Sequence, residues 1–109
     1  NEKAFADWQE LAKDLRTVYG AEAKYRLSQM LFDDEEYAAA EQQVLQFIDQ
    51  STPHAYWLAR AFVLLSDVYA AQGKNMEARQ YLLSLKQNYQ ADDDIAGMIE
   101  ERLATITEE

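Results

Sequence analysis

The sequence predicts an all-α protein of about six helices, and three observations indicate this class. One Pro and three Gly in 109 residues favour helices over a turn-rich β fold. Apolar residues recur at steps of three and four along most of the chain, and no alternating run of β-branched residues is present. A hydrophobic content of 49% with 12% aromatic residues indicates a folded chain that buries a modest core.

The first two predicted helices precede a run of acidic residues. The first spans about residues 2–19, and its apolar residues share one face: Phe5, Trp8, Ala12, Leu15 and Tyr19. Gly20 is expected to end this helix. The second spans residues 21–32 and runs into "DDEE", Asp33 to Glu36. That stretch suits a turn followed by the acidic first turn of the next helix.

The third predicted helix begins at Tyr37 and ends before the stretch "QSTPH". In that stretch Thr52 is the expected N-cap and Pro53 the expected first residue of a fourth helix, residues 53–72. The fourth helix is apolar on much of its circumference, which is typical of a helix packed between neighbours. Gly73 is expected to adopt the left-handed conformation, with a positive φ angle, that closes the fourth helix.

The last two predicted helices complete the set. The fifth spans residues 75–88 and carries an apolar stripe: Ala78, Leu82, Leu85 and Tyr89. Asp92 to Asp94 offer caps for a sixth helix, which carries Ile95, Met98, Ile99, Leu103 and Ile106. We expect the six helices to pair as three hairpins.

Part of the sequence is an internal repeat. The interval from Ser28 to Ser66 recurs from Leu31 to Tyr69 and from Ala40 to Ala78. We call it the repeat spacing. A helix pair that recurs at a fixed period is the sequence pattern of stacked helical repeats. The small serines allow a second helix to approach closely. The two alanines are therefore expected to be buried where the returning helix crosses.

This pattern resembles the tetratricopeptide repeat. That family has Leu and a small residue, an aromatic residue three positions later, Gly at the turn, another aromatic residue, and Ala on the second helix. The second copy matches at Leu65, Ser66, Tyr69, Gly73 and Ala78. The first copy matches at Leu27, Ser28, Tyr37 and Ala40, with Val44 and Phe47 continuing down the second helix. In departure from the family, Glu35 stands where Gly is usual, Asn75 replaces the aromatic residue after the turn, and the repeat spacing exceeds the usual period of about 34.

The resemblance implies an α–α superhelix, a tetratricopeptide-like solenoid of three antiparallel helical hairpins. It divides a single domain, residues 1–109, into four parts: the second helix of a preceding repeat (1–19), two repeats (20–52 and 53–90), and a terminal capping helix (91–109). The repeats are similar to those near the C-terminal end of long tetratricopeptide proteins of Bacteroidetes. That similarity alone favours the bacterial cell envelope or periplasm and leaves the compartment unknown. Because no Met precedes Asn1, we expect the chain to be part of a longer protein.

The charge balance argues against several classes of partner. Ten basic residues face 20 acidic ones, for a net charge of −10, which repels nucleic-acid phosphates and anionic membrane surfaces. No apolar run reaches the length of about 18 to 20 residues needed to span a bilayer. We therefore expect neither nucleic-acid binding nor membrane insertion. The absence of Cys excludes a disulfide framework and a thiol nucleophile.

The polar motifs predict no enzyme, no cofactor and no metal site. His54 is the only histidine, and it is expected to be a first-turn surface residue because no second nitrogen or thiolate ligand accompanies it. The acidic runs lack the calcium-loop spacing and are expected to be a turn and helix caps. No phosphate loop, nucleophile elbow or zinc-protease motif is present. Trp8 and Trp57 are expected in the core or between repeats, with ligand stacking as the alternative.

The remaining candidate is a surface. In the tetratricopeptide family the first helix of each hairpin lines a concave groove that takes a peptide or helix. Carried over, that groove is lined by Glu22, Tyr25, Gln29, Phe32, Arg60, Val63, Asp67 and Ala70. The alternative is that Tyr25, Phe32 and Val63 only pack between repeats. The cationic clamp of chaperone-binding members is absent, because those places hold Tyr25, Gln29, Val63 and Asp67.

The function expected from the resemblance is a protein–protein interaction module. We expect it to recognise a mainly apolar helix or extended segment with a few basic residues. Tyr25 is the expected exposed anchor, so that Tyr25→Ala would weaken binding and leave the melting temperature nearly unchanged. The alternative is a structural terminal cap of a longer repeat array with no ligand of its own.

Overall fold

The computed structural model describes residues 2–106, which form six α-helices and no strand. The bounds are α1 Glu2–Leu11, α2 Val18–Asp33, α3 Tyr37–Asp49, α4 Ala55–Ala71, α5 Asn75–Asn88 and α6 Ile95–Thr105. The all-helical class and the six helices are thus confirmed for this part of the chain. Residue 1 and residues 107–109, the outer ends of the first and last predicted segments, lie outside the described residues.

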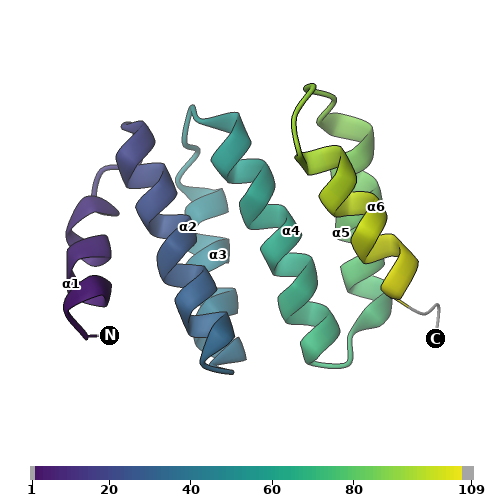
Figure 1. The fold of residues 1–109 in the computed structure, drawn as a ribbon, viewed down its shortest axis with the longest axis horizontal. Coiled ribbons are helices and arrows are strands. Elements are labelled where there is room, and N and C mark those ends of the chain that lie inside the picture. Colours follow the sequence, from purple (N-terminus) through teal and green to yellow (C-terminus); the bar gives the residue numbers. More distant parts are fainter. Residues whose placement is uncertain (1, 107–109) are drawn as a thin grey trace.

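The helices form two layers (Figure 1). Helices α2, α4 and α6 lie side by side in the front layer, and α3 and α5 lie behind it. Helix α2 packs on α3 and α4 packs on α5, so each pair forms a hairpin. Helix α1 packs on α2 at the N-terminal edge, and α6 packs on both α4 and α5. The molecule measures 38 × 30 × 21 Å.

Helix α4 lies between two hydrophobic clusters. The first joins α2, α3 and α4 and contains Leu15, Ala21, Tyr25, Val44, Phe47, Ala61, Leu64 and Leu65. The second joins α4, α5 and α6 and contains Ala59, Val63, Leu82, Leu85, Ile95 and Ile99. A helix that faces two clusters must be apolar on much of its circumference. The prediction that the fourth helix packs between neighbours is therefore confirmed.

The small residues of the repeated pattern lie inside the hairpins. Ala40 and Ala78 are fully buried, as predicted. The two serines are buried as well, and their hydroxyl groups are satisfied. Ser28 Oγ donates to the carbonyl oxygen of Lys24 on its own helix, whereas Ser66 Oγ donates to the carbonyl oxygen of Ala78 at 3.1 Å. The second serine therefore joins α4 to α5 directly.

The prediction that the first helix continues to Tyr19 and ends at Gly20 is wrong. Helix α1 ends at Leu11, and α2 begins at Val18. Gly20 lies in the first turn of α2, where its N–H donates to the N-cap hydroxyl of Thr17 at 2.9 Å. A Cβ atom at this position would stand 1.7 Å from the carbonyl oxygen of Asp14. Gly20 is therefore required by the close approach of the preceding turn.

The predicted N-cap of the fourth helix is also wrong. Helix α4 begins at Ala55, with His54 in the N-cap position. The hydroxyl of Thr52 accepts the N–H of His54 at 3.3 Å and donates to the carbonyl oxygen of Leu15, 37 residues earlier, at 2.7 Å. That bond ties the connection before α4 to the connection before α2.

Gly73 has the positive φ angle that the sequence predicts, 79°. Glu35, which precedes Gly73 by the repeat spacing, has a φ of 62°. Both residues follow a helix end, and their N–H groups donate to the carbonyl oxygens of Phe32 and Ala70. The N–H of the next residue in each turn donates one residue further back, to Leu31 or Tyr69. The first hairpin therefore keeps the turn geometry without the glycine.

Candidate interaction surface

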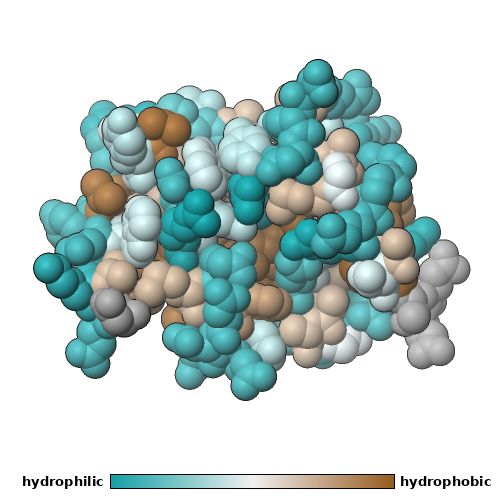
Figure 2. Space-filling view, in the orientation of Figure 1, coloured by the Kyte–Doolittle hydropathy of each residue, from teal (hydrophilic) through white to brown (hydrophobic). Residues whose placement is uncertain are grey.

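The eight residues of the predicted groove lie on α2 and α4, which are neighbours in the front layer. Six of them are partly exposed: Glu22, Gln29, Phe32, Arg60, Asp67 and Ala70. Figure 2 shows that hydrophilic side chains cover much of this face, with hydrophobic surface visible between them. We name this face the α2–α4–α6 face.

Tyr25 and Val63 are not exposed, contrary to their predicted place in the groove. Tyr25 is 4% exposed in the first cluster, and Val63 is 1% exposed in the second. Both lie where adjacent helices of the layer meet, so close helix packing removes them from the surface. Phe32 lies at the margin of the first cluster, 5.4 Å from the ring of Tyr37 between centroids. For Tyr25 and Val63 the alternative of packing between helices describes the structure.

Arg60 is the centre of an arginine–aromatic cluster, which consists of Arg26, Arg60, Tyr25, Tyr56 and Trp57. Its guanidinium lies 5.0 Å from the ring centroid of Tyr25 and 5.8 Å from those of Tyr56 and Trp57. It donates to the hydroxyl of Tyr56 at 2.9 Å and to that of Tyr25 at 3.3 Å. Arg26 lies over the rings of Tyr25 and Trp57. Cations over aromatic rings attract them, so this cluster binds α2 to α4.

Two further contacts join α4 to α6. Arg102 donates through Nε and Nη2 to the two carboxylate oxygens of Asp67, each at 3.3 Å. Asp94 accepts from the hydroxyl of Tyr56 at 2.8 Å and lies 3.5 Å from Arg60. Burial raises the pKa of the Asp67 carboxyl, and the bonds to Arg102 oppose this rise. The charged groups predicted to face a partner are therefore already paired within the chain.

The sequence interpretation missed Arg102 and Asp94. Asp94 follows Tyr56 by the repeat spacing, and α6 begins about two periods after the start of α2. Extending the repeat to a third copy would have placed α6 in the front layer beside α4. The signal was available in the spacing, but α6 shares few of the residue types of the earlier copies.

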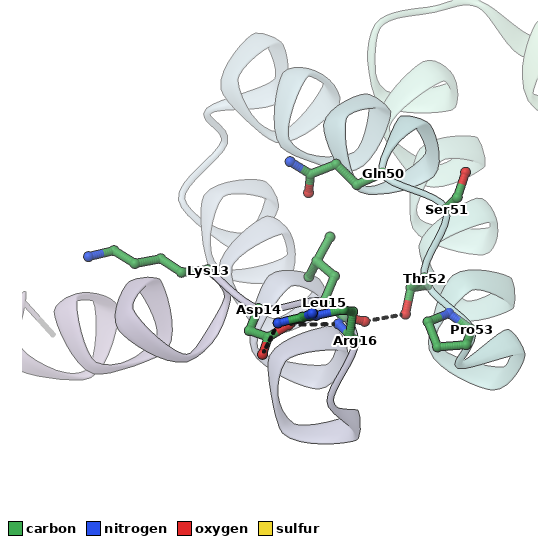
Figure 3. A pocket seen from close by; sticks show the side chains of 8 residues that line it. All are labelled: Lys13, Asp14, Leu15, Arg16, Gln50, Ser51, Thr52 and Pro53. Atoms are coloured by element: carbon green, nitrogen blue, oxygen red, sulfur yellow. Dashed lines mark hydrogen bonds and ion pairs between the residues drawn. The ribbon is translucent and has the colours of Figure 1, made fainter.

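An open cavity of about 400 Å³ lies where the connection between α1 and α2 meets the connection between α3 and α4 (Figure 3). Its polar groups bind each other: Thr52 donates to the Leu15 carbonyl, and Arg16 donates to Asp14 at 3.0 Å. The hydrogen bonds from Arg16 hold the pKa of the exposed Asp14 carboxyl below its ordinary value. The arrangement offers structural support to the loops and no pairing of nucleophile and base.

His54 lies near the same junction. Its Nε2 is 2.9 Å from the carbonyl oxygen of Arg16, and the side chain is half-buried. His54 is therefore more than the surface residue expected from the sequence. Its imidazole links the connection before α4 to the connection before α2. Within residues 2–106 no group of three or more His, Cys, Asp or Glu side chains is arranged to hold a metal ion.

Over the same residues, none of the helices combines the length and the apolar character needed to cross a bilayer. Comparison of the chain with protein-family models, with curated proteins and with solved structures gives no match.

Proposed function

We propose that the chain is a tetratricopeptide-like helical repeat module that mediates protein–protein interaction through its α2–α4–α6 face. The observation that carries the proposal is the front layer itself. The first helices of successive hairpins stand side by side and are joined by the arginine–aromatic cluster and by the Asp67–Arg102 pair. A surface held in place by its own contacts loses little entropy when a partner binds.

The chemistry of this face favours a partner with apolar and basic residues. Phe32 and Ala70 supply partly exposed apolar surface, and Glu22 supplies a partly exposed carboxylate that lies 3.4 Å from Nε of Arg26. The net charge of −10 attracts a basic segment from a distance. Tyr25 now supports the face from beneath instead of anchoring the partner. Truncating such a buried ring costs about 3 to 5 kcal/mol of stability, so Tyr25→Ala is a test of folding and not of binding.

The test is selection from a random peptide display library, followed by NMR mapping of a selected peptide on the ¹⁵N-labelled protein. We expect peptides rich in apolar and basic residues that shift the amide signals of α2 and α4. Glu22→Lys should weaken such a peptide about tenfold, because an attraction becomes a repulsion. Glu77→Lys makes the same charge change on the exposed surface of α5 and is the matched control. Shifts confined to α3 and α5, or equal effects of the two variants, would refute the proposal.

The pairing within the face supports a second candidate. Arg60 and Asp67 already bind Asp94 and Arg102 of the C-terminal part of the chain, and α6 covers α4 and α5. A structural segment that closes a longer helical array would have this arrangement and would need no ligand. It predicts that the selection returns no peptide that binds the α2–α4–α6 face.

A further inference from the structure

Lys24 is a buried cation inside the first hairpin. Its side chain belongs to α2 and is 8% exposed. The ammonium donates to Oε1 of Gln43 at 2.6 Å and to Oε1 of Gln46 at 3.1 Å, both on α3. Among the described residues, none of the ion pairs involves Lys24. An ammonium has three N–H donors, so one remains without a protein acceptor.

The second hairpin has aromatic residues at the positions that correspond to Lys24 and Gln43. Phe62 follows Lys24 by the repeat spacing, and Tyr81 follows Gln43 by the same interval. The rings of Phe62 and Tyr81 stack, with 6.3 Å between centroids. The first hairpin replaces this apolar pair with a cation that has neutral partners only. Burying a cation without a counter-charge is costly, and such breaks in a consistent pattern are typical of functional positions.

Lys24 is one of the residues that line a cavity of about 500 Å³ between α1, α2 and α3. Phe5, Ala6 and Leu27 supply apolar lining, and the amides of Gln9 and Gln50 supply polar lining. Lys13 and Glu10 also line it, but they are highly exposed and form a 2.9 Å ion pair with each other. This volume lies within the range of small-molecule sites, and the lining is more polar than is usual for them, since six of the ten lining residues carry polar side chains.

We propose that this cavity binds a small organic carboxylate. The carboxylate accepts the remaining N–H of Lys24 and supplies the missing counter-charge, while its hydrocarbon part lies against Phe5, Ala6 and Leu27. The acidic net charge opposes an anion only over long distances, and salt at about 0.15 M screens charges beyond about 8 Å. The inference does not depend on the proposed function, because the cavity is lined by α1 and α3 as well as α2.

The state of the Lys24 amine offers a direct readout. Burial lowers the pKa of this amine. A bound carboxylate favours the charged form and must therefore raise that pKa. A ligand that binds elsewhere on the chain has no reason to change it.

The experiment is a titration of the ¹³C,¹⁵N-lysine-labelled chain with butyrate at about 0.15 M salt, observed by NMR. Butyramide, the neutral analogue, is the control ligand. We expect saturable shifts of the Lys24 side-chain signals with butyrate, a rise of the Lys24 pKa, and neither effect with butyramide. Absence of saturation with butyrate, or equal responses to both ligands, would overturn the proposal.

Two variants separate this site from general attraction to lysines. Lys24→Met should weaken butyrate binding at least about tenfold, because a hydrogen bond to a charged group is lost. Lys3→Met removes an exposed amine of α1 that does not line the cavity and should leave the affinity within about threefold. Should Lys24→Met fail to fold, Ala6→Phe decides the question, since its ring fills the cavity from α1. Unchanged butyrate affinity in a folded Lys24→Met, or in Ala6→Phe, would overturn the proposal.

Discussion

The turns of the two hairpins place different residues in the same left-handed conformation. Glu35 has a φ of 62° and Gly73 a φ of 79°, and both lie one residue beyond a helix C-cap. This conformation costs a residue with a Cβ atom about 1 to 2 kcal/mol, whereas glycine adopts it freely. The first hairpin therefore contains backbone strain that the second avoids.

Exchanging the two residue types should have opposite effects. Glu35→Gly is expected to raise the free energy of unfolding by about 1 kcal/mol, and Gly73→Ala to lower it by a similar amount. Urea unfolding of each variant measures both changes. Glu36→Gly removes the same charge from a residue with a φ of −88° and is the control. Stabilisation by Glu36→Gly as large as that by Glu35→Gly would argue against strain as the cause.

Lys24 should give the stability of the chain a pH dependence in the alkaline range. Because burial lowers its pKa, the folded chain binds fewer protons than the unfolded chain between that lowered pKa and the ordinary value of 10.5. Stability therefore rises with pH in this window, as the cost of the buried charge disappears. The stability of the parent relative to Lys24→Met should increase between pH 7 and pH 10 in urea unfolding. A constant or falling difference would contradict a buried charged amine. Lys13→Met is the control for loss of one amine.

Among the elements, α1 and α4 are opposite extremes. Helix α1 has no buried residue and packs on α2 alone, whereas α4 buries residues toward two clusters. Tertiary packing supplies most of the stability of a helix of this length. The hairpin helices are therefore the stable elements, and their crossings determine how closely they pack.

The crossing of α4 and α5 should not tolerate a larger residue at Ala78. This side chain is fully buried, and its carbonyl accepts the hydroxyl of Ser66. Ala78→Leu is expected to overpack the crossing and cost about 1 to 3 kcal/mol. Ala38→Leu makes the same change on the exposed side of α3 and should have little effect. Thermal melts compare the two variants. A melt of Ala78→Leu that matches the parent would contradict a close crossing at this residue.

Over the whole molecule, stability is distributed between two clusters that meet at α4. Helices α2 and α3 contribute to one cluster, and α5 and α6 to the other. The two ends of the described chain do not contact each other, because α1 packs on α2 alone. We therefore expect a change at one end to act first on the cluster at that end.

Ile99→Ala should weaken one end of the molecule selectively. Ile99 is 1% exposed in the second cluster, and removing its side chain costs about 2 to 5 kcal/mol. Native-state hydrogen exchange is expected to accelerate in α5 and α6 while α2 and α3 keep their protection. Leu64→Ala, in the first cluster, is the reciprocal control and should accelerate exchange in α2 and α3. Equal acceleration throughout the chain by Ile99→Ala would mean that the domain unfolds only as a unit.

The features that depend on local periodicity are predictable from the sequence. The all-helical class, the number of helices, the left-handed Gly73 and the burial of Ala40 and Ala78 all follow from apolar spacing and residue size. These signals are local because a helix repeats every few residues and because glycine alone adopts a positive φ without cost. The repeat spacing also indicated which helices correspond.

Contacts between groups far apart in the sequence depend on how the helices pack. The Thr52 hydroxyl donates to a carbonyl 37 residues away instead of capping α4. Gly20 is required because the backbone of Asp14 approaches it closely. Tyr25 is not exposed in the predicted groove, because the packing of α2 against α4 buries its side chain. Local patterns likewise do not show that Arg102 pairs with Asp67 or that Lys24 has only neutral partners. A helical pattern specifies which residues share a face, but the distance and angle of the neighbouring helix decide whether that face meets water or protein.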